Sequence, residues 1–304
     1  MKRALVFPGQ GSQYVGMGQD LFDKHQSIKD MYAQAKKILG FDVADVSFNG
    51  PLEALTETKV TQPALFVVSA ALFSLLPKSY AFSMTAGHSL GEFSALFAAG
   101  VLGFEDALAI VKIRSEGMQA AGESQTGTMA AILNMSREDV AKVCKHAALR
   151  GIVQPANFNS PGQIVISGET VAVHYAMEIA KNLGARKVLA LNVSGAFHSP
   201  LMAGAKDGLS AIIEKTNFNK ARVPVVANVD ATPTSEPKKI KANLIDQLQS
   251  PVLWEDTVLY MVNNGVDEIV EIGPGKVLQG LVKRISRDMA TGGIANQEQL
   301  EALS

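Results

Sequence analysis

The sequence predicts an α/β protein in two parts: a large domain built on a mostly parallel sheet, and a smaller subdomain inserted into it. Short apolar runs alternate with helical patterns along most of the 304 residues, which is typical of a parallel sheet with helices on both faces. A Gly-x-Ser-x-Gly motif at residues 87–91 lies between a predicted strand and a predicted helix. Between residues 128 and 193 the predicted elements follow the order β-α-β-β-α-β of ferredoxin-like folds.

The small subdomain is assigned to residues 125–194, and the large domain to residues 1–124 and 195–304. Small and polar residues from Gly122 to Gly127 form a candidate linker between the two parts. The expected elements of the subdomain are strands at 128–133, 152–157, 163–167 and 186–193, and helices at 136–149 and 170–183.

The large domain is predicted from the same patterns. Its expected strands are 4–7, 81–86, 223–229 and 267–272, and its expected helices are 20–39, 61–76, 92–99, 105–121, 240–249, 253–264 and 276–286. Pro63 is expected in the first turn of its helix, where a missing N–H does no harm. The tail beyond Gly292 is expected to be frayed.

Composition limits the possible functions. Hydrophobic residues make up 47% of the chain and charged residues 19%, which is enough to bury a substantial core. The net charge of −1 gives no electrostatic reason to expect nucleic acid or an anionic membrane as a partner. The single cysteine, Cys144, excludes an internal disulfide, and no metal-binding motif is present. We expect a soluble cytoplasmic protein, or one of an organelle stroma or matrix if a transit peptide was removed.

Ser89 is the candidate nucleophile. The glycines of the 87–91 motif allow a sharp turn that exposes the serine Oγ, and the Leu90 N–H at the helix start faces any oxyanion that forms there. A plain strand-to-helix turn is the alternative interpretation.

The loop at residues 8–13, Pro-Gly-Gln-Gly-Ser-Gln, follows the first strand. Three interpretations stay open for it. It can bind phosphate, although the P-loop lysine and the dinucleotide-binding spacing are both missing. It can simply turn the chain, or its backbone N–H groups can form half of an oxyanion hole.

Arg114 is anomalous, because it lies in the middle of the apolar face of its helix, close to Ile110, Val111 and Met118. A buried guanidinium needs an anionic partner, since an unpaired buried charge costs several kcal/mol. The arginine either reaches solvent, forms a structural ion pair, or binds the carboxylate of a substrate.

His198 is the candidate general base. It precedes Ser199-Pro200, a good helix start, and a helix N-terminus disfavours the imidazolium form. The alternative is a surface histidine at a turn. No Asp or Glu lies in an obvious position to orient this ring, so a backbone or amide carbonyl is expected to do so.

Six segments taken together resemble the malonyl-CoA:acyl carrier protein transacylases of fatty-acid synthesis, in the order of that family and over essentially the whole chain. They are Phe-Pro-Gly-Gln-Gly-Ser-Gln at 7–13, Gly-His-Ser-Leu-Gly-Glu at 87–92, Arg114, Asn-Phe-Asn-Ser-Pro at 157–161, Ala-Phe-His-Ser at 196–199, and Glu-Ile-Gly-Pro-Gly at 271–275. The resemblance implies a hydrolase-like α/β domain with a ferredoxin-like insert.

The resemblance also implies roles for individual residues. Ser89 corresponds to the acylated nucleophile and His198 to the general base. Arg114 corresponds to the arginine that pairs with the malonyl carboxylate. The backbone N–H groups of Gln10 and Leu90 correspond to the oxyanion hole.

Gln247 corresponds to the glutamine whose backbone carbonyl orients the histidine, which would explain the missing acid. Ser115 departs from the family, which often has glycine after the arginine; helix packing can differ there, with little effect expected on the carboxylate-binding arginine. The Ala-Phe-His context is similar to the malonyl-selective members.

The resemblance therefore implies transfer of a malonyl group from malonyl-CoA to the phosphopantetheine thiol of acyl carrier protein, with no metal or redox cofactor. A free-standing acyltransferase of a polyketide synthase and a serine thioesterase are the alternatives. A monomer is expected, with no nucleic acid or membrane as partner. The basic run Lys283, Arg284 and Arg287 can contact an acidic carrier or simply face solvent.

Overall fold

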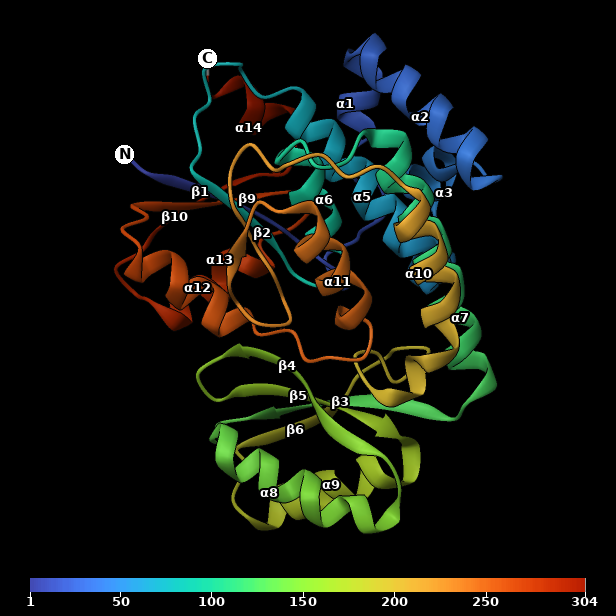
Figure 1. The fold of residues 1–304 in the computed structure, drawn as a ribbon, viewed down its shortest axis with the longest axis vertical. Helices are drawn as coiled ribbons and strands as arrows, with labels where there is room; N and C mark the ends of the chain where they lie inside the picture. Colours follow the sequence, from blue (N-terminus) through green and yellow to red (C-terminus); the bar gives the residue numbers. More distant parts are fainter. Residues whose placement is uncertain (304) are drawn as a thin grey trace.

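The computed structural model describes residues 1–303 and contains two sheets (Figure 1). The six strands of the larger sheet are, in spatial order, β10 (Ala290–Ile294), β9 (Glu268–Ile272), β1 (Arg3–Phe7), β2 (Met84–Gly87), β7 (Val225–Val226) and β8 (Pro233–Thr234). Every neighbouring pair is parallel except β7 with β8.

Helices cover both faces of this sheet. The helices of the large domain are α1 (Gln19–Lys24), α2 (Gln26–Leu39), α3 (Val43–Asn49), α4 (Leu52–Thr56), α5 (Thr58–Ser74), α6 (Gly91–Ala98), α7 (Phe104–Ser124), the 3-10 helix η2 (Pro200–Ala205), α10 (Lys206–Lys215), α11 (Pro237–Gln247), α12 (Trp254–Asn263), α13 (Val277–Ile285) and α14 (Gln297–Glu301). Side chains of β1 alternate between two cores. Leu5 and Phe7 pack with α5, α6 and α7, whereas Ala4 and Val6 pack with α12 and α13.

The smaller sheet lies below the larger one in Figure 1 and is antiparallel, in the order β4-β5-β3-β6. Its elements are β3 (Gly127–Leu133), α8 (Arg137–Ala147), the 3-10 helix η1 (Ala148–Arg150), β4 (Val153–Ser160), β5 (Gln163–Glu169), α9 (Thr170–Asn182) and β6 (Lys187–Ala190). One face packs against α8 and α9. The predicted fold class, a parallel-sheet α/β domain with a ferredoxin-like insert, is confirmed. The exact boundaries 125–194 stay a prediction.

The insert is tied to the large domain by backbone hydrogen bonds. Val252 N–H donates to Ala156 O over 2.9 Å, and Phe158 N–H donates to Val252 O over 2.9 Å. Strand β4 thus pairs with the segment that leads into α12. Because β4 also borders the candidate site, this pairing fixes the insert over the carboxyl edge of the large sheet.

Several sequence predictions about single elements are wrong. The expected helix 20–39 is two helices that break at His25, whose backbone is extended. Pro63 lies inside α5, because this helix begins at Thr58. The expected strand 223–229 pairs only at Val225–Val226.

The carboxyl-terminal tail was also predicted incorrectly. Residues 290–294 form β10, which pairs with β9 in parallel, and residues 297–301 form α14. Strand β10 contains Gly292 and Gly293, and glycine has a low strand propensity, so the sequence of this segment indicated a loop.

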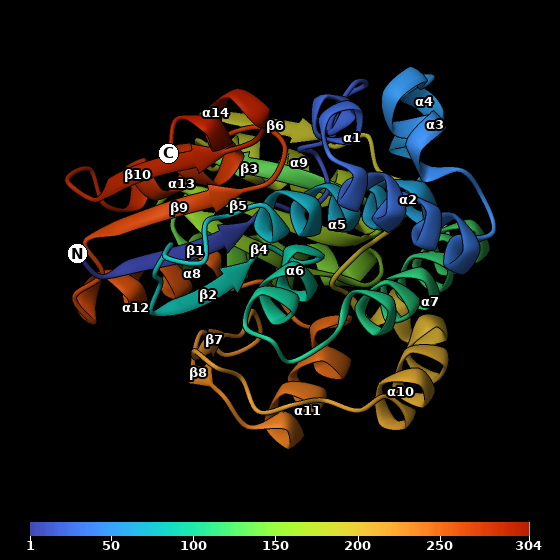
Figure 2. The same ribbon diagram turned by 90° about the horizontal axis from the view of Figure 1, so that it is seen from above.

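Strand β1 and the turn after β2 touch at Gly91. A Cβ atom at residue 91 would lie 2.0 Å from Phe7 O, which is backbone and cannot move aside. The helix α6 therefore starts against β1 only because residue 91 has no side chain. Figure 2 shows α6 following β2 beside β1.

Gly91→Ala is expected to destabilise the protein by about 3 kcal/mol or more, because the extra methyl forces β1 and α6 apart. Gly280→Ala is the matched control: position 280 lies inside α13 and a Cβ there meets no atom within 4 Å. That variant is expected to gain about 0.5–1 kcal/mol of helix stability. Chemical denaturation measures both, and equal stability of the two variants would contradict the close approach.

Candidate active site

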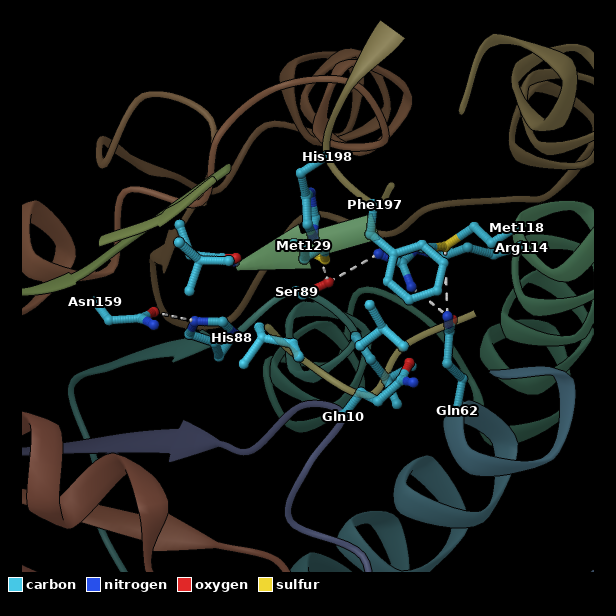
Figure 3. Close-up of a pocket in the computed structure, with 15 residues that line it drawn as sticks. Gln10, Gln62, His88, Ser89, Arg114, Met118, Met129, Asn159, Phe197 and His198 are labelled. Carbon is cyan, nitrogen blue, oxygen red and sulfur yellow. Dashed lines mark hydrogen bonds between the residues drawn. The ribbon is translucent and has the colours of Figure 1, made fainter. Parts of the chain in front are cut away.

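Ser89 lies at the end of β2, on the turn that leads into α6, and its backbone is left-handed with φ 52°. Such a conformation is strained for a residue with a side chain. Two contacts from Asn228 hold it: the Asn228 Oδ1 accepts from Ser89 N–H over 2.7 Å, and its Nδ2 donates to Gly87 O over 2.7 Å. The turn is therefore braced from outside, and the serine Oγ projects into a cavity (Figure 3).

His198 faces this hydroxyl. Its Nε2 lies 2.8 Å from Ser89 Oγ, and its Nδ1 lies 2.9 Å from Gln247 O. Because a carbonyl oxygen only accepts, the Nδ1 carries the hydrogen and Nε2 is left to accept the serine proton. This places Ser89, His198 and the Gln247 backbone carbonyl in one line of hydrogen bonds.

His198 is 3% exposed, so it is not a surface histidine. Burial, and next the charge of Arg114, lower the pKa of His198 to about 3. The ring is therefore neutral at pH 7 and able to take a proton. The cause differs from the one expected from the sequence, because burial and a nearby cation dominate rather than the following helix.

Arg114 lies on α7, is 1% exposed and does not reach solvent. Its guanidinium donates to three neutral acceptors: Gln62 Oε1 at 2.5 Å, Ser89 Oγ at 3.0 Å and Gln247 Oε1 at 2.9 Å. Within residues 1–303 no carboxylate forms an ion pair with Arg114. This excludes the structural ion pair, which was one of the alternatives from the sequence. The Arg114 Nε is buried and finds no acceptor among the residues that the structure describes.

Gln10 and Leu90 border the same cavity as Ser89. Among residues 1–303 neither backbone N–H takes part in a hydrogen bond to the protein. The N–H of Leu90 lies at the start of α6, where the helix dipole favours negative charge. Within the described residues, both N–H groups are therefore left without a protein acceptor in residues that line the cavity. A phosphate-binding role for the 8–13 loop receives no support from this arrangement.

His88 and Asn159 join the two parts of the chain beside the turn. The His88 Nε2 lies 2.8 Å from Asn159 Oδ1 of β4, and its ring packs on Trp254. Burial lowers the pKa of His88. Figure 3 shows this pair on the opposite side of Ser89 from Arg114.

Sequence reasoning missed three residues that the site depends on: Gln62, Asn228 and Glu92 as a partner of Gln247. A glutamine in the largely apolar helix α5 was a usable signal for Gln62, since a buried amide needs a partner. Asn228 follows a very short strand and offers no signal of its own. Glu92 belongs to the 87–92 segment, but its contacts come from residues more than 130 positions away.

Among residues 1–303 no group of three His, Cys, Asp or Glu side chains is arranged to hold a metal ion. No helix in the same range has the length and apolar character needed to cross a membrane.

A parallel-sheet fold with a braced serine, a neutral histidine and a buried arginine is suited to acyl-group chemistry at a serine. Comparison with known families agrees. Residues 4–299 match the family model described as the acyl transferase domain. The chain belongs to this family.

The similar proteins within this family are malonyl transacylases. A malonyl CoA-acyl carrier protein transacylase of Staphylococcus aureus is 42% identical over 301 residues, which is 99% of this chain and 97% of that protein. A crystal structure of an acyl carrier protein S-malonyltransferase from Vibrio cholerae superposes with a TM-score of 0.95 at 42% identity, and covers 100% of both chains. A malonyl-transacylase in complex with its type II PKS acyl-carrier protein matches with a TM-score of 0.95 at 40% identity, over 99% of this chain and 98% of that one.

The low pKa of His198 predicts how acylation depends on pH. A histidine with an ordinary pKa near 6.5 would lose about thirtyfold in kcat/KM between pH 8 and pH 5, because it would be protonated. With a pKa of about 3 the free enzyme keeps the base neutral across this range, so we expect no acid-side loss. The rate of Ser89 acylation in single-turnover experiments, measured as a function of pH, tests this. A decrease of that rate toward acid pH with a midpoint between pH 6 and 7 would contradict it.

Proposed function

We propose that this chain transfers the malonyl group of malonyl-CoA to the phosphopantetheine thiol of an acyl carrier protein, through a malonyl ester on Ser89. One observation carries the proposal: the guanidinium of Arg114 is fixed 3.0 Å from Ser89 Oγ without a carboxylate partner. In a malonyl thioester one methylene separates the carboxylate from the reacting carbonyl. A cation next to the nucleophile therefore suits an acyl donor that ends in a carboxylate.

In the first half-reaction the Ser89 hydroxyl gives its proton to His198 Nε2 and its oxygen attacks the thioester carbonyl. In this proposal the N–H groups of Gln10 and Leu90 stabilise the oxyanion, and one such donor is typically worth about 3 kcal/mol. The tetrahedral intermediate collapses, the carbon–sulfur bond breaks, and the CoA sulfur leaves with the proton from His198. A malonyl-Ser89 ester remains.

The second half-reaction reverses these roles. The thiol of the carrier gives its proton to His198 and attacks the ester, and the Ser89 oxygen leaves and takes the proton back. Arg114 holds the carboxylate through both steps. Nucleophile, base, oxyanion donors and cation cover every step, so we infer that the reaction requires no metal or redox cofactor.

The carrier protein is the partner of this reaction. We favour a carrier of fatty-acid synthesis, as the resemblance in sequence implies; the names of the relatives specify an acyl carrier protein. A polyketide carrier is the second candidate, because one similar solved structure is a complex with a type II PKS acyl-carrier protein. The monomeric state, the cytoplasmic or organellar location, and the absence of nucleic-acid or membrane partners remain predictions.

Intact-protein mass spectrometry tests the function. After mixing with malonyl-CoA we expect a malonyl adduct on Ser89 that persists without carrier and moves to the thiol of holo acyl carrier protein. Ser89→Ala should form no adduct, whereas Ser94→Ala, a buried serine of α6 outside the cavity, should form it normally. Loss of the adduct into free malonate without carrier would favour the thioesterase alternative.

Arg114→Ala is expected to lower kcat/KM for malonyl-CoA far more than for acetyl-CoA. Losing the partner of a buried charged group costs about 2–5 kcal/mol, so the malonyl rate should fall at least about thirtyfold relative to the acetyl rate. Lys112→Ala, on the exposed side of the same helix, is the control and should leave both rates unchanged. Equal loss on both donors would remove Arg114 as the carboxylate-binding residue.

A further inference from the structure

Glu92 is a buried carboxylate three residues after Ser89, in the first turn of α6, and is 2% exposed. Its Oε2 accepts from the Nε2 of Gln247 over 2.8 Å and from the backbone N–H of Asn228 over 3.1 Å. Burying an ionised carboxylate is costly unless its hydrogen bonds are satisfied. Nothing in the proposed reaction steps uses this group.

The side chain of Gln247 connects Glu92 to Arg114. Its Oε1 accepts from the Arg114 Nη2 over 2.9 Å, while its Nε2 donates to Glu92 and, over 3.1 Å, to Ser89 O. An arginine only donates, so the amide oxygen must face Arg114 and the amide nitrogen must face Glu92. One amide thus separates the buried cation from the buried anion.

The charges around Glu92 are few. Burial is the largest influence on the pKa of Glu92 and raises it, whereas the hydrogen bonds from Gln247 and Asn228 lower it. Of the charged groups, Arg114 on α7 lowers this pKa and Asp230 in the loop between β7 and β8 raises it. His88 and His198 stay neutral at pH 7 because burial lowers the pKa of both. Where Glu92 is ionised, its charge and that of Arg114 therefore balance each other before substrate enters.

A substrate carboxylate changes this balance, because two carboxylates would then share one buried guanidinium. Like charges in a buried site are not both stable, and one of the two groups takes up a proton. The substrate acid is in direct contact with the cation, so it keeps its charge. Glu92, which lies on the other side of the Gln247 amide from Arg114, is therefore the group that takes up the proton.

We propose that Glu92 is a positioning residue, which holds Arg114 against Ser89 through the Gln247 amide and takes up one proton from solvent when a substrate carboxylate binds. This inference rests on the proposed malonyl transfer. Burial raises the pKa of Glu92 to about 7, so the ionised form is populated and can accept a proton near neutral pH. Ionised Glu92 opposes the incoming carboxylate, so affinity for malonyl donors should fall as pH rises through 7, whereas affinity for acetyl donors should not follow this titration.

Isothermal titration calorimetry tests this in the Ser89→Ala background, where no acylation occurs. Malonyl-CoA and acetyl-CoA are titrated at pH 7.5 in buffers of different ionisation enthalpy, which gives the protons taken up on binding. Acetyl-CoA corrects for protons on the CoA phosphates. We expect malonyl-CoA to take up about half a proton or more in excess of acetyl-CoA, as follows from a free pKa near 7 that rises on binding.

The second variant adds Glu92→Gln, which keeps a hydrogen-bond acceptor but removes the charge. We expect its excess uptake to vanish and its ratio of malonyl to acetyl dissociation constants to be flat between pH 6 and 8.5. Glu271→Gln is the matched control, since Glu271 is also buried but binds the start of α13, and its uptake should stay as in the parent. Infrared difference spectra of the parent provide a measurement that does not need the variant, as a protonated carboxyl band should appear with malonyl-CoA only.

The outcomes separate the two proposals. Tighter binding of malonyl-CoA than of acetyl-CoA without excess proton uptake would overturn the role of Glu92 and leave the malonyl function standing. Equal affinity for both donors, together with no malonyl adduct in the chain that retains Ser89, would overturn the function itself.

Discussion

The buried guanidinium of Arg114 is the constraint on which the rest of the site depends. A cation that is 1% exposed and lacks an ion-pair partner costs several kcal/mol unless its donors are satisfied. The structure supplies neutral acceptors from two distant helices, Gln62 on α5 and Gln247 on α11. Because these acceptors are neutral, the positive charge is not cancelled by direct contact. The guanidinium lies 3.0 Å from Ser89 Oγ and is held ready for an anion.

Two residues of the site, Ser89 and His198, have a strained backbone conformation. Ser89 and His198 are both left-handed, with φ of 52° and 56°, and each such residue costs about 1–3 kcal/mol. The strain is balanced by contacts from segments that come together only in the folded chain. Asn228 braces the turn of Ser89, and Gln154 of the inserted β4 donates to His198 O over 2.9 Å. The insert is therefore part of the catalytic framework as well as a wall of the cavity.

The serine turn and the buried arginine could be predicted from the sequence because both signals are local. Gly87 and Gly91 mark a close approach of backbone, and Arg114 interrupts an apolar helix face, so each anomaly lies within a few residues. Glu92, Gln62 and Asn228 could not be assigned in the same way. Their partners lie on other elements, and no local pattern specifies which amide will meet which charge.

The amide between Glu92 and Arg114 has a physical advantage over a direct ion pair. A carboxylate bound directly to the guanidinium would occupy its donors and compete with a substrate in the same geometry. Across Gln247 the carboxylate still supports the positive charge, because its field acts through a buried region of low dielectric. The Arg114 Nε meanwhile has no acceptor within residues 1–303. An arginine arranged in this way is charged, fixed and incompletely satisfied, which are the three properties that favour binding of a carboxylate over a neutral acyl group.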